Sequence, residues 1–86
     1  MDEQSAVELV ISVVSKSRTV DPSLLSESTH FVDDLGFDSL DASELLAALH
    51  QQTGRRLAIT DLSELATIGQ VAKALAAQEV AEEVRP

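Results

Sequence analysis

Apolar residues along this chain recur at the spacing of one helical face in three separate segments. The first stripe consists of Val7, Val10, Ile11 and Val14. It follows a capping-box pattern, Ser5-x-x-Glu8, in which each side chain can satisfy a free backbone amide. Because an apolar stripe behind such a cap is typical of an amphipathic helix, the pattern predicts a helix over residues 5–17.

Two further stripes follow the first. The second consists of Ala42, Leu45, Leu46 and Leu49. Gly54 stands just past its end, where a left-handed residue commonly ends a helix, so we expect a helix over residues 39–53. The third consists of Ile68, Val71, Ala72 and Leu75. It follows a second capping-box pattern, Thr67-x-x-Gln70, and predicts a helix from about residue 68 that frays into a charged tail over residues 79–86.

The connection between the first two predicted helices, residues 18–38, is long for a compact domain. Asp21-Pro22 favours one local helical turn within it, because proline suits the first position of a helix. We expect three apolar side chains to hold this loop against the core: Phe31, Leu35 and Phe37. A short helix is predicted over residues 61–65, where an Asp-x-x-Glu pattern provides a cap.

These elements together predict an all-α fold. No segment alternates apolar and polar residues over a useful length, so we expect no sheet. Phenylalanines 31 and 37 are the whole aromatic content, which leaves the core to Leu, Val, Ile and Ala. The chain is predicted to form one domain over residues 1–86. Its architecture would be a small up-and-down bundle of three main helices, with a short helix before the last and a long ordered loop after the first.

The charge of the chain indicates which partners it can attract. Six basic and 15 acidic residues give a formal net charge of −9 at pH 7. Such a surface repels phosphate backbones and anionic lipids, which argues against nucleic acid and membranes and favours proteins with basic docking patches. No cysteine is present, so disulfides cannot support the fold. The acidic start of the chain and the lack of a long apolar run predict a cytoplasmic protein, and we expect a monomer.

One segment, residues 31–46, carries the distinctive motif of the chain and reads FVDDLGFDSLDASELL. It closely resembles the attachment site of acyl carrier proteins, in which an Asp-Ser-Leu triplet opens the second helix. In that family a separate transferase attaches the 4′-phosphopantetheine arm of coenzyme A to the serine, which corresponds here to Ser39. The resemblance extends to the order and spacing of the predicted helices. It implies a carrier that holds acyl groups as thioesters on this arm.

The local chemistry of Ser39 has two interpretations. If Asp38 is the N-cap of the helix, its carboxylate takes the free amides and the Ser39 hydroxyl is left to project outward, near the positive end of the helix. In the other interpretation Ser39 is itself the cap, the commonest reason for a serine before an apolar helical stripe. The surrounding motif favours the first interpretation.

The resemblance also implies which partners and surface residues take part. The partners would be a phosphopantetheinyl transferase, an acyltransferase or acyl-activating ligase, a ketosynthase and other enzymes with basic docking patches. The expected docking residues surround Ser39: Asp38, Leu40, Asp41 and Glu44. The three acids among them lie at i, i+3 and i+6, on the first two turns of the predicted helix.

Nothing in the sequence favours catalysis or metal binding by the chain itself. His30 lies in the loop and His50 far along the second predicted helix, so neither is placed to activate Ser39 as a base. The acids of residues 33–44 lack the alternating ligands, central glycine and distal glutamate of a calcium loop. We therefore expect a carrier without catalytic residues and without a metal site.

The pathway is indicated by positions where the chain departs from housekeeping fatty-acid carriers. Those proteins continue their acidic surface along the second helix, whereas this chain has His50, Gln51 and Gln52 there. Residues 57–60 read Leu-Ala-Ile-Thr in place of a proline and further acids. This difference favours a discrete, type II carrier for polyketide or related specialised biosynthesis. The alternatives are a housekeeping fatty-acid carrier, an aminoacyl or peptidyl carrier, and a helical interaction module without a prosthetic group.

Overall fold

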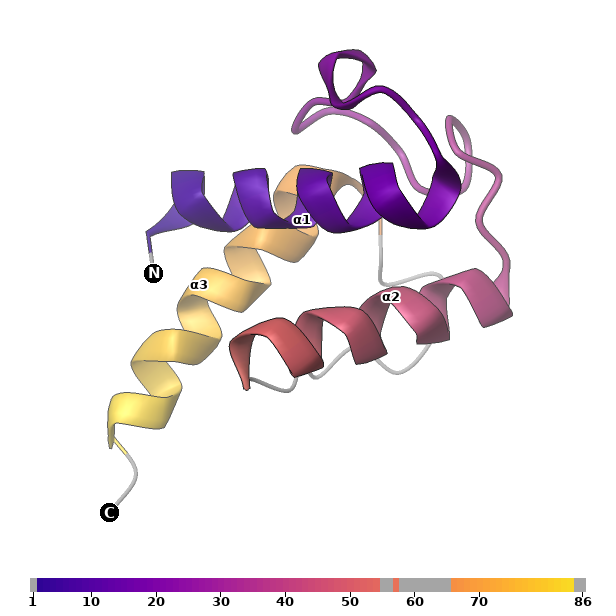
Figure 1. The fold of residues 1–86 in the computed structure, drawn as a ribbon. Helices are drawn as coiled ribbons and strands as arrows, with labels where there is room; N and C mark the ends of the chain where they lie inside the picture. The colour runs from indigo at the N-terminus through magenta and orange to yellow at the C-terminus, as the bar shows by residue number, and fades with distance from the viewer. Residues whose placement is uncertain (1, 55–56, 58–65, 85–86) are drawn as a thin grey trace.

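Three α-helices form where the apolar stripes predict them. The computed structural model describes residues 2–54, 57 and 66–84. Its elements are α1 (Glu3–Arg18), the 3-10 turn η1 (Pro22–Leu24), α2 (Ser39–Thr53) and α3 (Ile68–Val84). α2 runs back along α1 in the opposite direction, and α3 crosses α1 obliquely and passes beyond the end of α2 (Figure 1). The expected all-α bundle is confirmed, whereas the short helix predicted over residues 61–65 lies outside the described residues.

The start of α1 differs from the prediction. Asp2, not Ser5, is the N-cap, because the Asp2 carboxylate accepts a hydrogen bond of 2.8 Å from the Ser5 amide. The capping box predicted for Ser5 and Glu8 is therefore wrong, and Ser5 lies within the first turn of a helix that begins at Glu3. Aspartate and serine cap helices about equally well, so the residue types alone did not distinguish the two positions.

The bundle core is aliphatic and follows the predicted stripes closely. Its buried helical side chains are Ala6, Val7, Val10, Val13 and Val14 in α1, Ala42, Leu45 and Leu49 in α2, and Ile68, Val71, Ala72 and Leu75 in α3. Ile11 and Leu46, which were expected in the stripes, are only half-buried at their edges. α1 packs more extensively on α3 than on α2, so the first and last helices form the larger part of the core.

The long loop is ordered by contacts with the core and with the start of α3. Phe31 and Phe37 are buried as predicted, with ring centroids 5.1 Å apart, and Leu35 is half-buried. Backbone hydrogen bonds join the loop to α3: the Phe31 amide donates to the Ala66 carbonyl, and the Gly69 amide donates to the Glu27 carbonyl. The loop therefore has a fixed course before it enters α2.

Within the described residues, the local signals for η1, for the end of α2 and for the start of α3 are confirmed. η1 begins at Pro22 behind the Asp21 cap, and α2 ends at Gly54 in the left-handed conformation. The Thr67 hydroxyl accepts a hydrogen bond of 3.2 Å from the Gln70 amide, as expected for a helix cap. α3 continues to Val84, past the point where the sequence predicts its charged tail to begin.

The described residues contain a single isolated bridge, between His30 and Thr67, and no strand. None of the described helices is long and apolar enough to cross a membrane.

Candidate functional site

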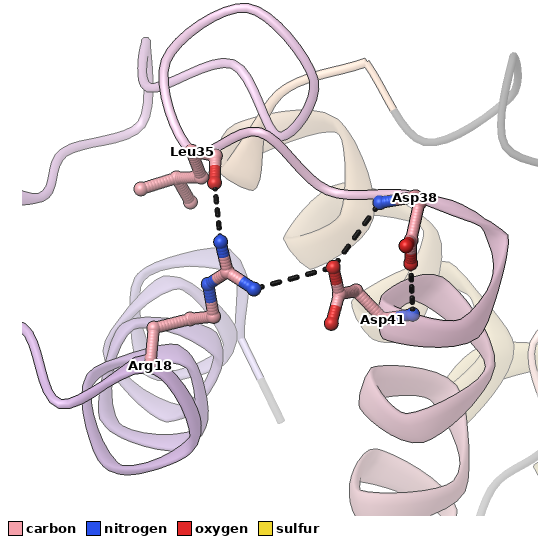
Figure 2. A network of polar contacts seen from close by, with 4 residues as sticks. All are labelled: Arg18, Leu35, Asp38 and Asp41. Atoms are coloured by element: carbon pink, nitrogen blue, oxygen red, sulfur yellow. Dashed lines mark hydrogen bonds and ion pairs between the residues drawn. The ribbon is translucent and has the colours of Figure 1, made fainter.

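Ser39 is the first residue of α2, and Asp38 is the cap that precedes it. The Asp38 carboxylate accepts a hydrogen bond of 2.9 Å from the Asp41 amide, and the Asp41 carboxylate accepts one of 3.2 Å from the Asp38 amide (Figure 2). The two aspartates therefore form a reciprocal capping box. This arrangement assigns the cap to Asp38, and the side chain of Ser39 is left exposed to solvent.

The ionisation of Asp38 follows from its role as cap. The hydrogen bond from the Asp41 amide lowers the pKa of the Asp38 carboxyl below its ordinary value of 3.8, and this effect outweighs the opposing influence of desolvation. Asp38 is therefore charged throughout the neutral range. Its negative charge lies at the positive end of the α2 dipole, where it further stabilises the helix.

Arg18, in the last turn of α1, links three parts of the site. Its guanidinium lies 3.2 Å from an Asp41 carboxylate oxygen and donates a hydrogen bond of 2.7 Å to the Leu35 carbonyl (Figure 2). The same group lies 5.1 Å from the centroid of the Phe37 ring. Arg18 thus connects the end of α1, the loop and the first turn of α2.

Arg18 was not identified from the sequence as part of the site. A cation in the last turn of a helix is explained well enough by the helix dipole, which gave no reason to assign Arg18 a partner. Its contact with Asp41 depends on the path of the loop, which the residue pattern does not specify.

The loop approaches α2 through a tight turn at Gly36. Gly36 has a φ of 68°, in the left-handed region that glycine adopts without the strain of a Cβ atom. Its amide donates to the Val32 carbonyl, and the Phe37 amide donates to the Phe31 carbonyl. This turn lets the Phe37 ring enter the core immediately before Asp38. The Gly-Phe pair of the motif therefore has a structural explanation.

The residues expected to dock partners differ in their surroundings. Leu40 is 66% exposed, and Asp38 and Glu44 are also exposed. No hydrogen bond or ion pair joins Glu44 to another described residue. Asp41, in contrast, is half-buried and engaged by Arg18 and by the capping box. Of the three acids, Asp41 is the least available to a partner.

His30 interacts with Asp33 and Asp34 within the loop, and His50 lies far along α2 from Ser39. The Asp34 carboxylate accepts a hydrogen bond of 2.7 Å from the His30 amide, and the His30 ring lies 4.0 Å from Asp33. His50 is in the last turn of α2, about 16 Å along the helix from Ser39 at 1.5 Å per residue. Within the described residues no three His, Asp or Glu side chains gather as a metal site would require.

The capping role of Asp38 predicts a pH-dependent effect of Asp38→Asn. Because the folded pKa is lowered, the charged cap stabilises the protein above the unfolded pKa, and this contribution is lost as the pH falls through the folded value. Asparagine can also cap a helix, so only the charge contribution is removed. We expect the variant to melt below the wild type at pH 7 and the difference to shrink towards pH 3, as measured by circular dichroism. A difference that stays constant with pH would contradict this assignment.

Comparisons with known proteins agree with the geometry of this site. The family model described as the phosphopantetheine attachment site matches residues 8–75. Acyl carrier protein 2 of Ralstonia nicotianae is 30% identical over 71 residues, which are 83% of this chain and 88% of that protein. The mitochondrial acyl carrier protein 2 of Arabidopsis thaliana is 32% identical over 68 residues, which are 79% of this chain and 54% of that protein, so this chain spans about half its length. The chain belongs to the acyl carrier family, whose members carry covalently attached 4′-phosphopantetheine.

Proposed function

We propose that Ser39 is the residue that receives the 4′-phosphopantetheine group. The observation that carries this proposal is the division of roles at the start of α2: Asp38 caps the helix, and the Ser39 side chain is left exposed. If serine were the cap, its oxygen would accept a backbone hydrogen bond instead.

The surroundings of Ser39 fit an attached phosphodiester that stays free to move. The positive end of the α2 dipole favours a negative group at this position. The amide of Asp41 is already bonded to the Asp38 carboxylate, and the Asp38 amide to the Asp41 carboxylate. Since these amides are occupied, the chain does not use them to fix a phosphate. This arrangement supports an arm that can swing between enzymes.

We assign the base of the attachment step to the transferase, because His50 lies far along α2 and the His30 ring lies beside Asp33 in the loop. In this step the Ser39 oxygen forms a bond to the phosphorus next to the pantetheine portion of coenzyme A. The pyrophosphate bond breaks, adenosine 3′,5′-bisphosphate leaves, and the hydroxyl proton passes to a base of the transferase. The attached group then supplies a thiol that holds acyl groups as thioesters. The chain itself holds the acyl group near each docked enzyme, and this tethering raises the effective concentration of the acyl group there.

We further propose a docking surface around Ser39 that consists of Asp38, Leu40, Asp41 and Glu44. Glu44 supplies a negative charge that pairs with no other described residue, and Leu40 supplies an exposed apolar side chain beside the serine. Acidic and apolar groups on the same two turns suit a partner with a basic rim around an apolar contact. Asp41 contributes less charge than its position suggests, because Arg18 neutralises part of it.

The pathway that we propose is a discrete, type II polyketide or related specialised system. The supporting observation is the face of α2 beyond Glu44, where Gln51 and Gln52 are exposed and uncharged. An enzyme that recognises acids along the whole helix would find fewer of them here. A housekeeping fatty-acid carrier and an aminoacyl or peptidyl carrier are the alternatives within the same family.

The first prediction concerns attachment itself. Incubation with coenzyme A and a broad-specificity phosphopantetheinyl transferase is expected to add one phosphopantetheine to the wild type and none to Ser39→Ala, because the nucleophile is removed. Intact-protein mass spectrometry measures the addition. Ser43→Ala, which changes another exposed serine one turn along α2, serves as the matched control and should be modified normally. Continued modification of Ser39→Ala would refute the assignment.

The docking surface is tested by Glu44→Lys. Reversing this exposed charge should weaken the apparent affinity for the transferase roughly three- to tenfold at low salt, since it replaces attraction by repulsion. The free energy of unfolding should change by no more than about 0.5 kcal/mol. Glu8→Lys makes the same charge change on an exposed position of α1 and should leave the affinity unaltered. A loss of stability without a change in affinity would make Glu44 a structural residue.

The pathway proposal is tested by adding acids to α2. Gln51→Glu combined with Gln52→Glu should raise the rate at which fatty-acid condensing enzymes use the protein, about threefold or more at low salt. The gain should shrink at high salt, because exposed charges are screened over about 10 Å at 0.1 M salt. Gln4→Glu combined with Ser12→Glu adds the same charge to α1 as a control. A wild type that already matches a housekeeping carrier would contradict the proposal.

A further inference from the structure

The contact between Arg18 and the first turn of α2 indicates a role for Arg18 that the proposed function of Ser39 does not include. Arg18 lies in the last turn of α1, and the long loop separates it from Ser39 in the sequence. Its guanidinium binds the Asp41 carboxylate at 3.2 Å and the Leu35 carbonyl at 2.7 Å (Figure 2). These two groups flank Ser39 in sequence, one before it and one after it. A single cation therefore holds the chain on both sides of the serine.

The geometry suits arginine better than lysine. The planar guanidinium presents several N–H donors in a fixed fork, so two acceptors can be held at once in set directions. The side chain also lies against the Phe37 ring, and the guanidinium is 5.1 Å from the ring centroid. The ion pair is only partly exposed, with 31% of the Arg18 side chain and 24% of the Asp41 side chain accessible. Partial burial reduces the screening by salt that weakens fully exposed pairs.

The same Asp41 oxygen that contacts Arg18 accepts the hydrogen bond from the Asp38 amide. Movement of the Asp41 carboxylate would therefore disturb the capping box that sets the backbone at Ser39. Loss of Arg18 would also release the Leu35 carbonyl and loosen the loop as it enters α2. Both effects act on the orientation of Ser39, whereas Glu44 and Leu40 remain on the surface for docking.

We propose that Arg18 is a positioning residue for the modification of Ser39. It holds the end of the loop and the first turn of α2 so that the serine hydroxyl meets the reacting phosphorus in a productive orientation. This inference rests on the proposed function of Ser39. It assigns Arg18 an effect on the rate of the transfer step rather than on the affinity for the transferase.

The experiment measures kcat and KM of a phosphopantetheinyl transferase with the full chain as substrate. Arg18→Met keeps the aliphatic stem and removes the guanidinium. Its kcat should fall about tenfold, because misplacement of a reacting group by about 1 Å can cost about 100-fold. Its KM should stay within about twofold, because Leu40 and Glu44, the exposed docking residues that Arg18 does not contact, are unchanged. Arg18→Lys should give an intermediate kcat, since one ammonium reproduces the charge but not the fork.

A matched control is available in the same turn of α1. Lys16 is exposed, so Lys16→Met removes an equal charge without touching the site, and its kinetics should match the wild type. Arg18→Met should also be non-additive with Asp41→Asn, because the two residues act through one contact. Equal kcat values for Arg18→Met and Lys16→Met, a change confined to KM, or independent effects of the two substitutions would overturn the proposal.

The outcome is separable from that of the proposed function and from a general loss of stability. If Ser39→Ala abolishes modification while Arg18→Met reacts normally, only the role of Arg18 is wrong. If Ser39→Ala is still modified, the attachment site itself is wrong. Circular dichroism at the assay temperature establishes that each variant is folded. Should Arg18→Met not fold, Arg18→Lys decides, and a kcat equal to that of the wild type contradicts the proposal.

Discussion

The reciprocal hydrogen bonds between Asp38 and Asp41 are the constraint on which the candidate site depends. They begin α2 at Ser39 and supply the cap from the preceding residue, so the serine side chain takes no part in capping. A helix start leaves amides without partners, and in this chain carboxylates satisfy two of them. The outcome is an exposed serine at the start of a helix. The proposed attachment of phosphopantetheine by a separate enzyme requires such an accessible hydroxyl.

The rest of the fold serves to hold this helix start in place. The aliphatic core packs α1 against α3 and α2, and the buried pair Phe31 and Phe37 fixes the loop that leads to Asp38. Arg18 adds a polar link from α1 to the loop and to Asp41. Apolar packing thus positions the elements, and a small set of charged contacts sets the local geometry at Ser39. Two acidic residues of α2 differ in exposure. Asp41 is half-buried and pairs with Arg18, whereas Glu44 is exposed to solvent.

Much of the fold could be predicted because it rests on local signals. Helical spacing located the three α-helices of the described residues, and Gly54 and Pro22 marked a helix end and a turn start where the structure has them. The start of α1 was misplaced because several residues near it are competent caps, and the choice between Asp2 and Ser5 depends on the geometry of the whole turn. Ile11 and Leu46 were assigned to the core because spacing gives the direction of a stripe but not its width.

The candidate site was predicted in part. The motif pointed to Ser39 and to Asp38 as its cap, because both lie in one local segment. The partner of Arg18 could not be found in the same way, since the pair spans the long loop and depends on tertiary packing. For the same reason, Asp41 was expected to serve docking alone, whereas it also belongs to the capping box and to an ion pair. Residue patterns along the sequence do not predict long-range polar contacts of this kind.

The most direct test of the central claim is to locate the prosthetic group on protein purified from its native host. Trypsin cleaves after Arg18 and Arg55, which gives a fragment of residues 19–55 that contains Ser23, Ser26, Ser28, Ser39 and Ser43. Fragmentation of this peptide by electron transfer in a mass spectrometer assigns the added mass to one serine. We predict that phosphopantetheine is found on Ser39. Its presence on Ser43 or on a serine of the loop, or its absence from the purified protein, would contradict the account.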